Sequence, residues 1–249
     1  MNKYLTPLNS VTSPSSTVVL FHHAGGHANF FFSWRNNFPT DVAVYAVQLP
    51  GRMNRIEEPF DTSFVTTAQN ITNEIISTID TGVYFFGHSL GGILAYACSC
   101  ELQRRQWYNV QHLFISAAKT PQEVKVMETS VISEDAVRAY GGLPAELAND
   151  REVLNFFLPV IRADFKLVVD FKAFDCEILD IGVTAIYGLD DPSTRKQQIV
   201  GWDEYCRYPL NLISFPGDHF YLKEYAEDLC QLINNLSYAN SKSISNYKG

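Results

Sequence analysis

A serine lies between two closely spaced glycines in the pattern Gly87-x-Ser89-x-Gly91. The apolar run 83–86 before it predicts a buried strand, and segment 93–98 after it predicts a buried helix. G-x-S-x-G between a strand and a helix is typical of a nucleophile elbow, a strained turn that exposes the serine hydroxyl at the end of a sheet. Both glycines would be required because the strand and the helix cross closely. Ser89 is therefore the candidate nucleophile, the alternative being a glycine-rich turn in an ordinary strand–helix unit.

Two further ionisable groups follow predicted strands near the end of the chain. Asp191, next to Asp190, comes after the apolar run 183–187, and His219 comes shortly after the next such run. The order serine, acid, histidine is that of α/β-hydrolases, in which the histidine takes the serine proton and the acid orients the histidine. Parallel strands place their carboxyl ends at one edge of a sheet. We therefore expect Ser89, Asp191 and His219 to form a catalytic triad, with Asp190 as the alternative acid.

A glycine-rich loop, residues 22–28, follows the predicted strand 18–21. A loop in this position supplies one oxyanion donor in α/β-hydrolases, and its small residues let a backbone amide approach a ligand. We expect the amide of Ala24 to be this donor. The amide of Leu90, directly after the serine and at the start of a helix, is the expected second donor.

Three histidines in the same loop, His22, His23 and His27, raise the alternative of a metal site. Gly25 and Gly26 oppose a helix that would bring two of them together, and no carboxylate nearby completes a ligand set. We interpret these histidines as packing and hydrogen-bonding residues, and we expect neither a metal nor a cofactor.

Two arginines, Arg52 and Arg55, follow the predicted strand 42–47 and a Pro-Gly turn. One interpretation is that they belong to the solvated face of a loop. The other is that they contact an anionic arm of the substrate.

The alternation of strands and helices predicts an α/β fold with a mostly parallel central sheet flanked by helices. We expect one domain, residues 1–249, whose core spans about 17–119 and 179–236. Residues 1–16 predict a loose lead-in, and the polar tail of about 237–249 predicts disorder. Two helices are expected from apolar spacing within the core, at 64–79 and 225–236.

The strand–helix rhythm breaks between about residues 120 and 178. Helical patterns predominate there, at 133–140, 144–147 and 151–171. A helical insertion between sheet strands predicts a lid, and Gly141-Gly142 predicts its hinge. We expect this lid to be the most mobile part of the ordered domain and to gate the serine, the alternative being a separate small helical domain.

Composition limits the class of protein. The chain has 249 residues, of which 46% are hydrophobic, enough for one large α/β domain. A net charge of −8 argues against binding to nucleic acid. Five cysteines, an odd number without a C-x-x-C pair, predict free thiols in a reducing compartment. Without a signal-peptide pattern or an apolar run of membrane-spanning length, we expect a cytoplasmic protein that is monomeric and not bound to a membrane.

Six segments resemble those of type II thioesterases, the stand-alone editing hydrolases of non-ribosomal peptide and polyketide synthesis. In order they are F-H-H-A-G-G-H-A, V-Y-A-V-Q-L-P-G-R, G-H-S-L-G-G, L-P-V-I-R-A-D-F, Y-G-L-D-D-P and F-P-G-D-H-F-Y-L, within about residues 18–222. V-Q-L-P-G-R and I-R-A-D-F are more specific than the elbow. In the family pattern the acid directly precedes proline, which supports Asp191. His22 departs from the pattern, since the family usually has proline there.

The resemblance implies an α/β-hydrolase that removes aberrant or stalled acyl groups from the phosphopantetheine arm of an acyl or peptidyl carrier protein. The anionic arm that Arg52 and Arg55 would contact is then phosphopantetheine, or they would contact the carrier protein that bears it. A thiol with a pKa near 8.5 is an easier leaving group than an alkoxide, so a serine triad suffices for this chemistry. Three alternatives remain: a medium-chain fatty-acyl carrier-protein thioesterase, a general serine esterase, and a non-catalytic module that only docks a carrier protein.

Overall fold

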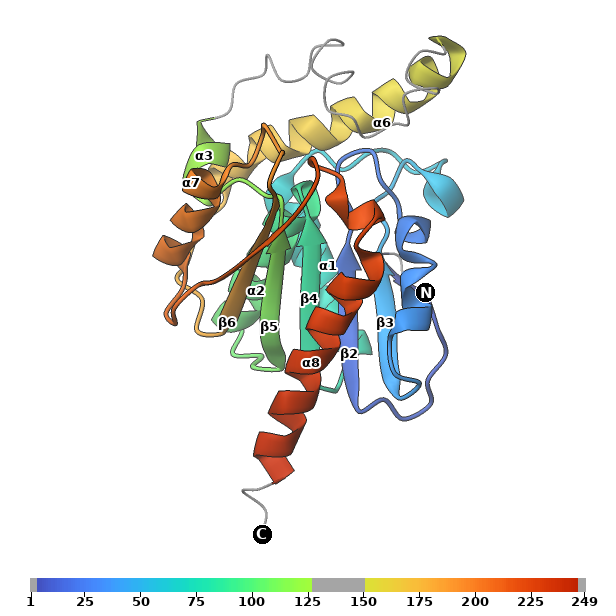
Figure 1. Ribbon diagram of the computed structural model, residues 1–249. Coiled ribbons are helices and arrows are strands. Elements are labelled where there is room, and N and C mark those ends of the chain that lie inside the picture. The colour runs from blue at the N-terminus through green and yellow to red at the C-terminus, as the bar shows by residue number, and fades with distance from the viewer. Residues whose placement is uncertain (1–3, 127–150, 246–249) are drawn as a thin grey trace.

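The computed structural model describes residues 4–126 and 151–245, which pack around one twisted sheet (Figure 1). The strand order in these residues is β1-β3-β2-β4-β5-β6-β7. Only β1 runs antiparallel to its neighbour, so the mostly parallel sheet that the sequence predicts is confirmed. The strands are β1 Leu5–Pro7, β2 Ser16–Phe21, β3 Val42–Val47, β4 Val83–His88, β5 Val110–Ser116, β6 Gly182–Gly188 and β7 Asn211–Phe215.

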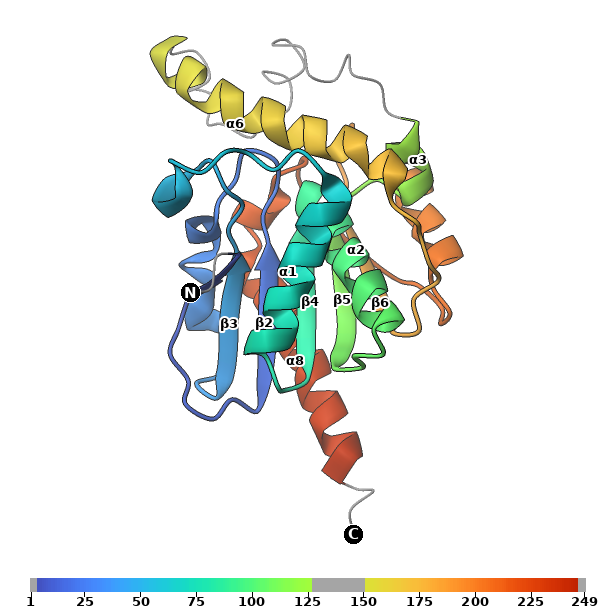
Figure 2. The ribbon, with the colours of Figure 1, turned by 180° about the vertical axis from the view of Figure 1, so that it is seen from behind.

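The central strands are largely apolar because helices cover both faces of the sheet. All six residues of β4 and five of the six in β2 are buried. Helices α1 (Phe64–Thr78) and α2 (Leu90–Arg104) cover one face, as Figure 2 shows. On the other face lie α8 (Ala226–Ser245) and the 3₁₀ helices η1 (Ala28–Phe31) and η2 (Trp34–Asn37). The sheet is thereby the middle layer of three.

Helix α1 illustrates how the sequence sets an element. The hydroxyl of Ser63 caps its first turn by accepting a hydrogen bond from the amide of Thr66. Buried residues then recur every three or four positions and face the sheet, at Phe64, Thr67, Ala68, Ile71, Thr72 and Ile75.

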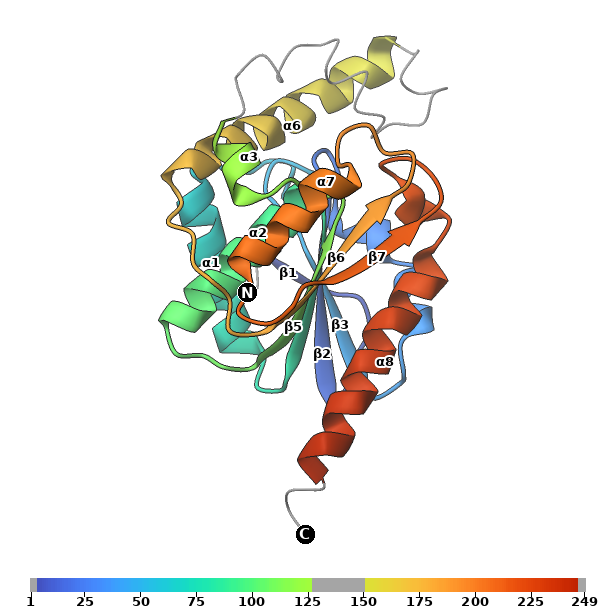
Figure 3. The ribbon, with the colours of Figure 1, turned by 60° about the vertical axis from the view of Figure 1, so that its left-hand side comes forward.

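Helix α6 (Arg151–Asp170) crosses the edge of the sheet at which the parallel strands end (Figures 1 and 3). Its second half is anchored by buried residues, among them Ile161 and Leu167. The prediction of a helix at 151–171 is confirmed, whereas the predicted helices at 133–140 and 144–147 and the Gly141-Gly142 hinge lie outside the described residues. The remaining short helices are α3 Pro121–Lys125, α7 Lys196–Ile199, η3 Met53–Arg55, η5 Phe171–Ala173, η6 Val200–Tyr205 and η7 Tyr221–Lys223.

Both ends of the chain differ from expectation. The prediction of a loose lead-in is wrong for residues 4–8, because β1 pairs with β3 and the amides of Tyr4 and Leu5 donate to the carboxylate of Glu74 at 2.8 Å. At the other end α8 continues to Ser245, past the expected end near residue 236, so the prediction of disorder from about residue 237 is wrong for residues 237–245. The apolar spacing ends near residue 236, but a helix already formed adds further residues without the cost of a new nucleus.

Candidate active site

Ser89 lies at a sharp turn between the end of β4 and the start of α2. Its backbone has φ 56° and ψ −119°, a region that non-glycine residues adopt only under strain, and its amide donates to the carbonyl of Ser116 at 2.8 Å. A Cβ added at Gly87 would lie 2.2 Å from the carbonyl oxygen of Gly91, and one at Gly91 would lie 2.1 Å from that of Phe21. Both glycines are therefore required, as expected from the sequence, because a side chain at either position would collide with backbone atoms. Ser89 itself is half-buried at the end of β4.

Asp191 and His219 come together at the same edge of the sheet. His219 Nδ1 lies 2.7 Å from Asp191 Oδ2, and both residues are buried. Asp191 Oδ1 accepts hydrogen bonds from the amide and the hydroxyl of Ser193, at 2.7 and 2.6 Å, and the hydroxyl of Thr194 donates to Oδ2. Burial by itself would raise the pKa of Asp191, but the hydrogen bond from His219, the charge of His219 and the two hydroxyls outweigh it and hold this pKa well below its usual range. The carboxylate is therefore ionised at neutral pH.

Asp190 and Asp218, the neighbours of this pair in sequence, point elsewhere. Asp190 is exposed, and its carboxylate accepts a hydrogen bond from the amide of Gly217 at 3.3 Å. Asp218 accepts from the amide of Phe220 at 2.7 Å. Of the two adjacent aspartates, Asp191 is the one that the fold brings to His219.

The loop after β2 forms a tight turn in which the amide of Gly26 donates to the carbonyl of His23 at 3.0 Å, and Gly25 has φ 77°. Because a trans peptide directs its N–H and C=O in opposite directions, the amide of Ala24 points away from this hydrogen bond. Ala24 itself is buried beside the sheet edge. Leu90 begins α2, where backbone amides have no partner within the helix.

Three further histidines around this edge, His22, His23 and His88, are buried, and burial disfavours their charged form. His22 Nδ1 lies 2.7 Å from the carbonyl oxygen of His23, and burial together with the charge of Arg52 lowers the pKa of His22 to about 3. Burial also lowers the pKa values of His23 and His88. His88 Nδ1 contacts the hydroxyl of Ser116 at 2.8 Å, and its ring centre lies 5.1 Å from that of His219. Among the described residues no cluster of three or more His, Cys, Asp or Glu side chains could hold a metal.

Arg52 and Arg55 are buried, which neither interpretation of the sequence expected. The guanidinium of Arg52 forms a two-pronged ion pair with Asp164 on α6, at 2.6 and 2.7 Å. That of Arg55 pairs with Glu58 at 2.7 and 2.9 Å and donates to the carbonyl of Gln48. Asp164 is a residue that sequence reasoning missed, although it belongs to I-R-A-D-F, one of the most specific segments of the resemblance.

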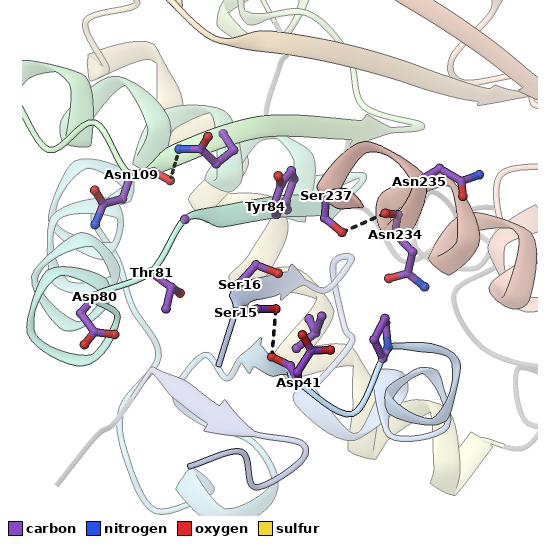
Figure 4. Close-up of a pocket in the computed structure, with 14 residues that line it drawn as sticks. Ser15, Ser16, Asp41, Asp80, Thr81, Tyr84, Asn109, Asn234, Asn235 and Ser237 are labelled. Carbon is purple, nitrogen blue, oxygen red and sulfur yellow. Dashed lines mark hydrogen bonds between the residues drawn. The ribbon is translucent and has the colours of Figure 1, made fainter. Parts of the chain in front are cut away.

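A separate hollow of about 750 Å³ opens at the amino ends of the strands, at the opposite edge of the sheet (Figure 4). It is lined largely by uncharged polar side chains of loops and strand starts and by the carboxylates of Asp41 and Asp80. No serine–histidine pair stands among these described lining residues, so the hollow does not compete with the elbow as the reactive site.

A mostly parallel sheet covered on both faces, with a serine at a nucleophile elbow on its carboxyl edge, defines the α/β-hydrolase fold. The sequence matches the family described as "Thioesterase domain" over residues 16–237, and the chain belongs to this family. The resemblance to thioesterases that the six segments indicate is thus confirmed.

Relatives and solved structures agree with this assignment. The chain is 29% identical over 246 residues to linear gramicidin dehydrogenase LgrE of Brevibacillus parabrevis, covering 93% of this chain and 94% of that one. It is 31% identical over 216 residues to the medium-chain S-acyl fatty acid synthase thioesterase of Rattus norvegicus, covering 82% and 81%. The structure of RedJ, a thioesterase of the prodiginine biosynthetic pathway in Streptomyces coelicolor, superimposes with a TM-score of 0.79 at 27% identity, covering 90% and 86%. In the part of the chain that the structure describes, no helix is long and apolar enough to cross a membrane.

Proposed function

We propose that this thioesterase hydrolyses acyl groups from the phosphopantetheine arm of carrier proteins and so removes aberrant or stalled groups in non-ribosomal peptide or polyketide synthesis. The observation that carries the proposal is the buried Asp191–His219 pair, with 2.7 Å between Nδ1 and Oδ2, at the sheet edge that also carries the strained Ser89 elbow. The six segments that resemble type II thioesterases imply a carrier-bound substrate, and the likeness to the gramicidin relative and to a thioesterase of prodiginine biosynthesis supports this class.

In the acylation step the Ser89 oxygen attacks the thioester carbonyl carbon while its proton passes to Nε2 of His219. Asp191, ionised and hydrogen-bonded at Nδ1, fixes the tautomer of His219 and stabilises the cation that forms. The carbonyl oxygen becomes an oxyanion, which the amides of Ala24 and Leu90 stabilise. Collapse breaks the carbon–sulfur bond, and the proton on His219 passes to the departing thiolate.

In the second step His219 takes a proton from water, whose oxygen attacks the acyl-serine ester. The same two amides stabilise the second oxyanion. Collapse breaks the bond to the serine oxygen, which recovers its proton from His219, and the carboxylic acid leaves. The protein's own groups suffice for both steps, with serine, histidine, aspartate and backbone amides in the roles described.

The name of one relative refers to a dehydrogenase, an activity that we do not transfer to this chain. Dinucleotide-binding folds carry G-x-G-x-x-G after a strand, and the sequence contains no such pattern, whereas it has G-x-S-x-G at that type of junction. The likeness to the rat enzyme supports, as the second candidate, a thioesterase for medium-chain fatty-acyl groups.

The test uses one acyl group on three leaving groups: a holo carrier protein, coenzyme A and a small alcohol. We expect the highest kcat/KM with the carrier protein, because binding energy from the carrier can be used to place the thioester at Ser89. Equal kcat/KM with the coenzyme A thioester or the ester would contradict the editing role and indicate a general hydrolase. Preference for medium acyl chains on the carrier, with no activity on short or aminoacyl groups, would favour the second candidate.

The Ser89→Ala variant is the control for the nucleophile. It should fold normally, lose labelling by a fluorophosphonate and lose turnover by a factor of about 10³ or more. Retention of a tenth of the wild-type rate would show that another group attacks the thioester, and would overturn the proposed mechanism.

A further inference from the structure

Asp164, in the second half of α6, binds three donors from two other parts of the chain. Its Oδ1 accepts from Arg52 Nη2 at 2.6 Å, and its Oδ2 accepts from Arg52 Nη1 and from the backbone amide of Gly25, each at 2.7 Å. The two side chains are 2% and 7% exposed. Burying such an ion pair costs desolvation energy, and removing one partner leaves the other as an uncompensated buried charge. The carboxylate therefore joins α6 tightly to the loops after β2 and β3.

The point of attachment is the turn that carries the proposed oxyanion donor. Asp164 holds the amide of Gly25, and Arg52 Nη1 also donates to the carbonyl of Gly26 at 3.2 Å. The turn closes on itself through the hydrogen bond from Gly26 to His23. The peptide between His23 and Ala24 carries the proposed donor N–H. It lies in a turn whose next two residues, Gly25 and Gly26, are hydrogen-bonded to Asp164 and Arg52.

Apolar packing also connects α6 to the turn 23–26. A Cβ added at Gly25 would lie 2.6 Å from Cγ1 of Ile161, a fully buried residue one turn before Asp164 on α6. The helix thus rests directly on the turn, with apolar contact beside the ion pair. If α6 shifts, the turn loses both its hydrogen-bond acceptor and its packing partner.

We propose that Asp164 is a positioning residue for acyl transfer, which acts through Arg52 and the Gly25 amide to preset the Ala24 N–H for the oxyanion. The inference rests on the proposed function. Oxyanion stabilisation depends on donors that are fixed before charge develops, and a misplacement of about 1 Å can cost about 10²-fold in rate. In this arrangement α6 belongs to the catalytic apparatus, and Arg52 serves the oxyanion and not the recognition of a carrier.

The chain offers a control in a second ion pair on the same loop. Arg55 and Glu58 form another two-pronged pair after β3, in which Arg55 is buried and Glu58 is 38% exposed. The Arg55 guanidinium also donates to the carbonyl of Gln48. Glu58→Gln therefore disturbs an arginine–carboxylate pair while leaving Asp164 and Arg52 unchanged. Asp164→Asn keeps the shape of the side chain but removes its charge. Arg52→Lys keeps a cation but not the fork, and it replaces Asp164→Asn if that variant does not fold.

Each variant is assayed with an acyl-pantetheine thioester and the same acyl group on a carrier protein. Two inhibitors distinguish binding of the substrate in its ground state from stabilisation of the oxyanion. One is a trifluoromethyl ketone, to whose carbonyl carbon the Ser89 oxygen adds reversibly, with its proton passing to His219 and the ketone oxygen becoming an oxyanion. The other is a thioether in which CH₂ replaces the thioester carbonyl, so that it binds without forming an oxyanion.

For Asp164→Asn we expect kcat to fall about ten- to a hundredfold on both substrates, with KM changed less than about twofold. The ketone should lose affinity by the same factor, the thioether should not, and Glu58→Gln should resemble the wild type in all four measurements. A folded Asp164→Asn enzyme with kcat within about threefold of wild type, or with undiminished affinity for the ketone, would overturn the inference. So would a rise of KM for the carrier alone in Arg52→Lys, which would return Arg52 to carrier recognition.

Failure of the proposed function would look different. If the wild-type protein hydrolyses no acyl thioester, the function is wrong. The rate of fluorophosphonate labelling would still test the inference, because the phosphoryl oxygen occupies the same oxyanion position. Slower labelling of Asp164→Asn at equal thermal stability would support the positioning role, and an unchanged rate would contradict it.

Discussion

At the scale of single residues, burial decides which of two adjacent aspartates can serve as the acid. Asp191 is buried, accepts from His219 and is held ionised by that contact and by two hydroxyl groups, whereas Asp190 is exposed and binds a backbone amide. A carboxylate that must orient an imidazole needs the buried position, where water cannot compete for the hydrogen bond.

We therefore expect Asp191→Asn to lower kcat/KM by about 10³ or more, because an amide would favour the wrong tautomer of His219. Asp190→Asn is the matched control and should stay within about threefold of the wild type. The measurement is kcat/KM on one acyl-pantetheine substrate for both variants, with thermal melting as the check on folding. The opposite ranking would assign the role of the acid to Asp190.

At this scale the sequence is informative where residue type and local context are distinctive. Ser89, Asp191 and His219 each follow an apolar run, and the order of the three types indicates the fold. The structure joins Asp191 to His219, and the complete triad stays a prediction. Arg52 shows the limit. Its partner lies 112 positions away on α6, and no local pattern says whether an arginine on a loop faces water or a buried carboxylate. The segment I-R-A-D-F contains Asp164, but the resemblance did not single out this residue or give it a role.

At the scale of elements, α6 is the part of the expected lid whose contacts with the core the structure describes. Ile161, Asp164 and Leu167 are buried, and Asp170 accepts a hydrogen bond from the amide of Phe64 at the start of α1. These contacts anchor the second half of the helix on the core. The expectation that residues of about 120–178 are the most mobile part of the ordered domain stays a prediction, and these contacts argue against it for the second half of α6.

We predict that amides of residues 158–170 exchange with deuterium about as slowly as those of α1, because opening them requires breaking a buried ion pair and apolar contacts. In Asp164→Asn the same amides and those of the loop 22–28 should exchange faster together, while β4 stays protected. The measurement is native-state hydrogen exchange followed by mass spectrometry. Rapid exchange across 158–170 in the wild-type protein would restore the picture of a mobile lid.

Long elements with clear periodicity were predictable, and short or polar ones were not. The strands β2 to β7 and helix α1 follow from apolar runs and spacing of three or four residues. Strand β1 is three residues long and ends in proline, so it has no pattern of its own and depends on pairing with β3. The aromatic segment that follows the loop 22–28 forms the 3₁₀ helices η1 and η2. Each is only four residues long, which is too short to produce a helical period in the sequence.

At the scale of the whole molecule, several buried histidines make stability depend on pH. His112 on β5 is buried, its Nε2 lies 2.8 Å from the hydroxyl of Thr184, and burial lowers its pKa to about 4. The unfolded chain takes up a proton at this residue below about pH 6.5, whereas the native protein does so only near pH 4. Between these values the unfolded state binds more protons, so stability falls as the pH falls. Asp191 acts in the same direction, but only below about pH 4, where the unfolded carboxylate is protonated.

We therefore predict that His112→Gln flattens the pH dependence of stability. A glutamine amide can still reach the hydroxyl of Thr184 but does not titrate, so the loss of unfolding free energy between pH 7.5 and pH 5 should shrink by about 2 kcal/mol. A slope should remain, because His22, His23 and His88 also have lowered pKa values. The measurement is urea-induced unfolding at both pH values.

Thr184→Val, which removes the hydrogen bond but keeps the titrating ring, should lower stability at both pH values and leave the difference between them close to that of the wild type. An unchanged difference in His112→Gln would mean that His112 is already protonated in the native protein at pH 5, in which case the buried imidazolium would have an anionic partner and not only the neutral contact with Thr184.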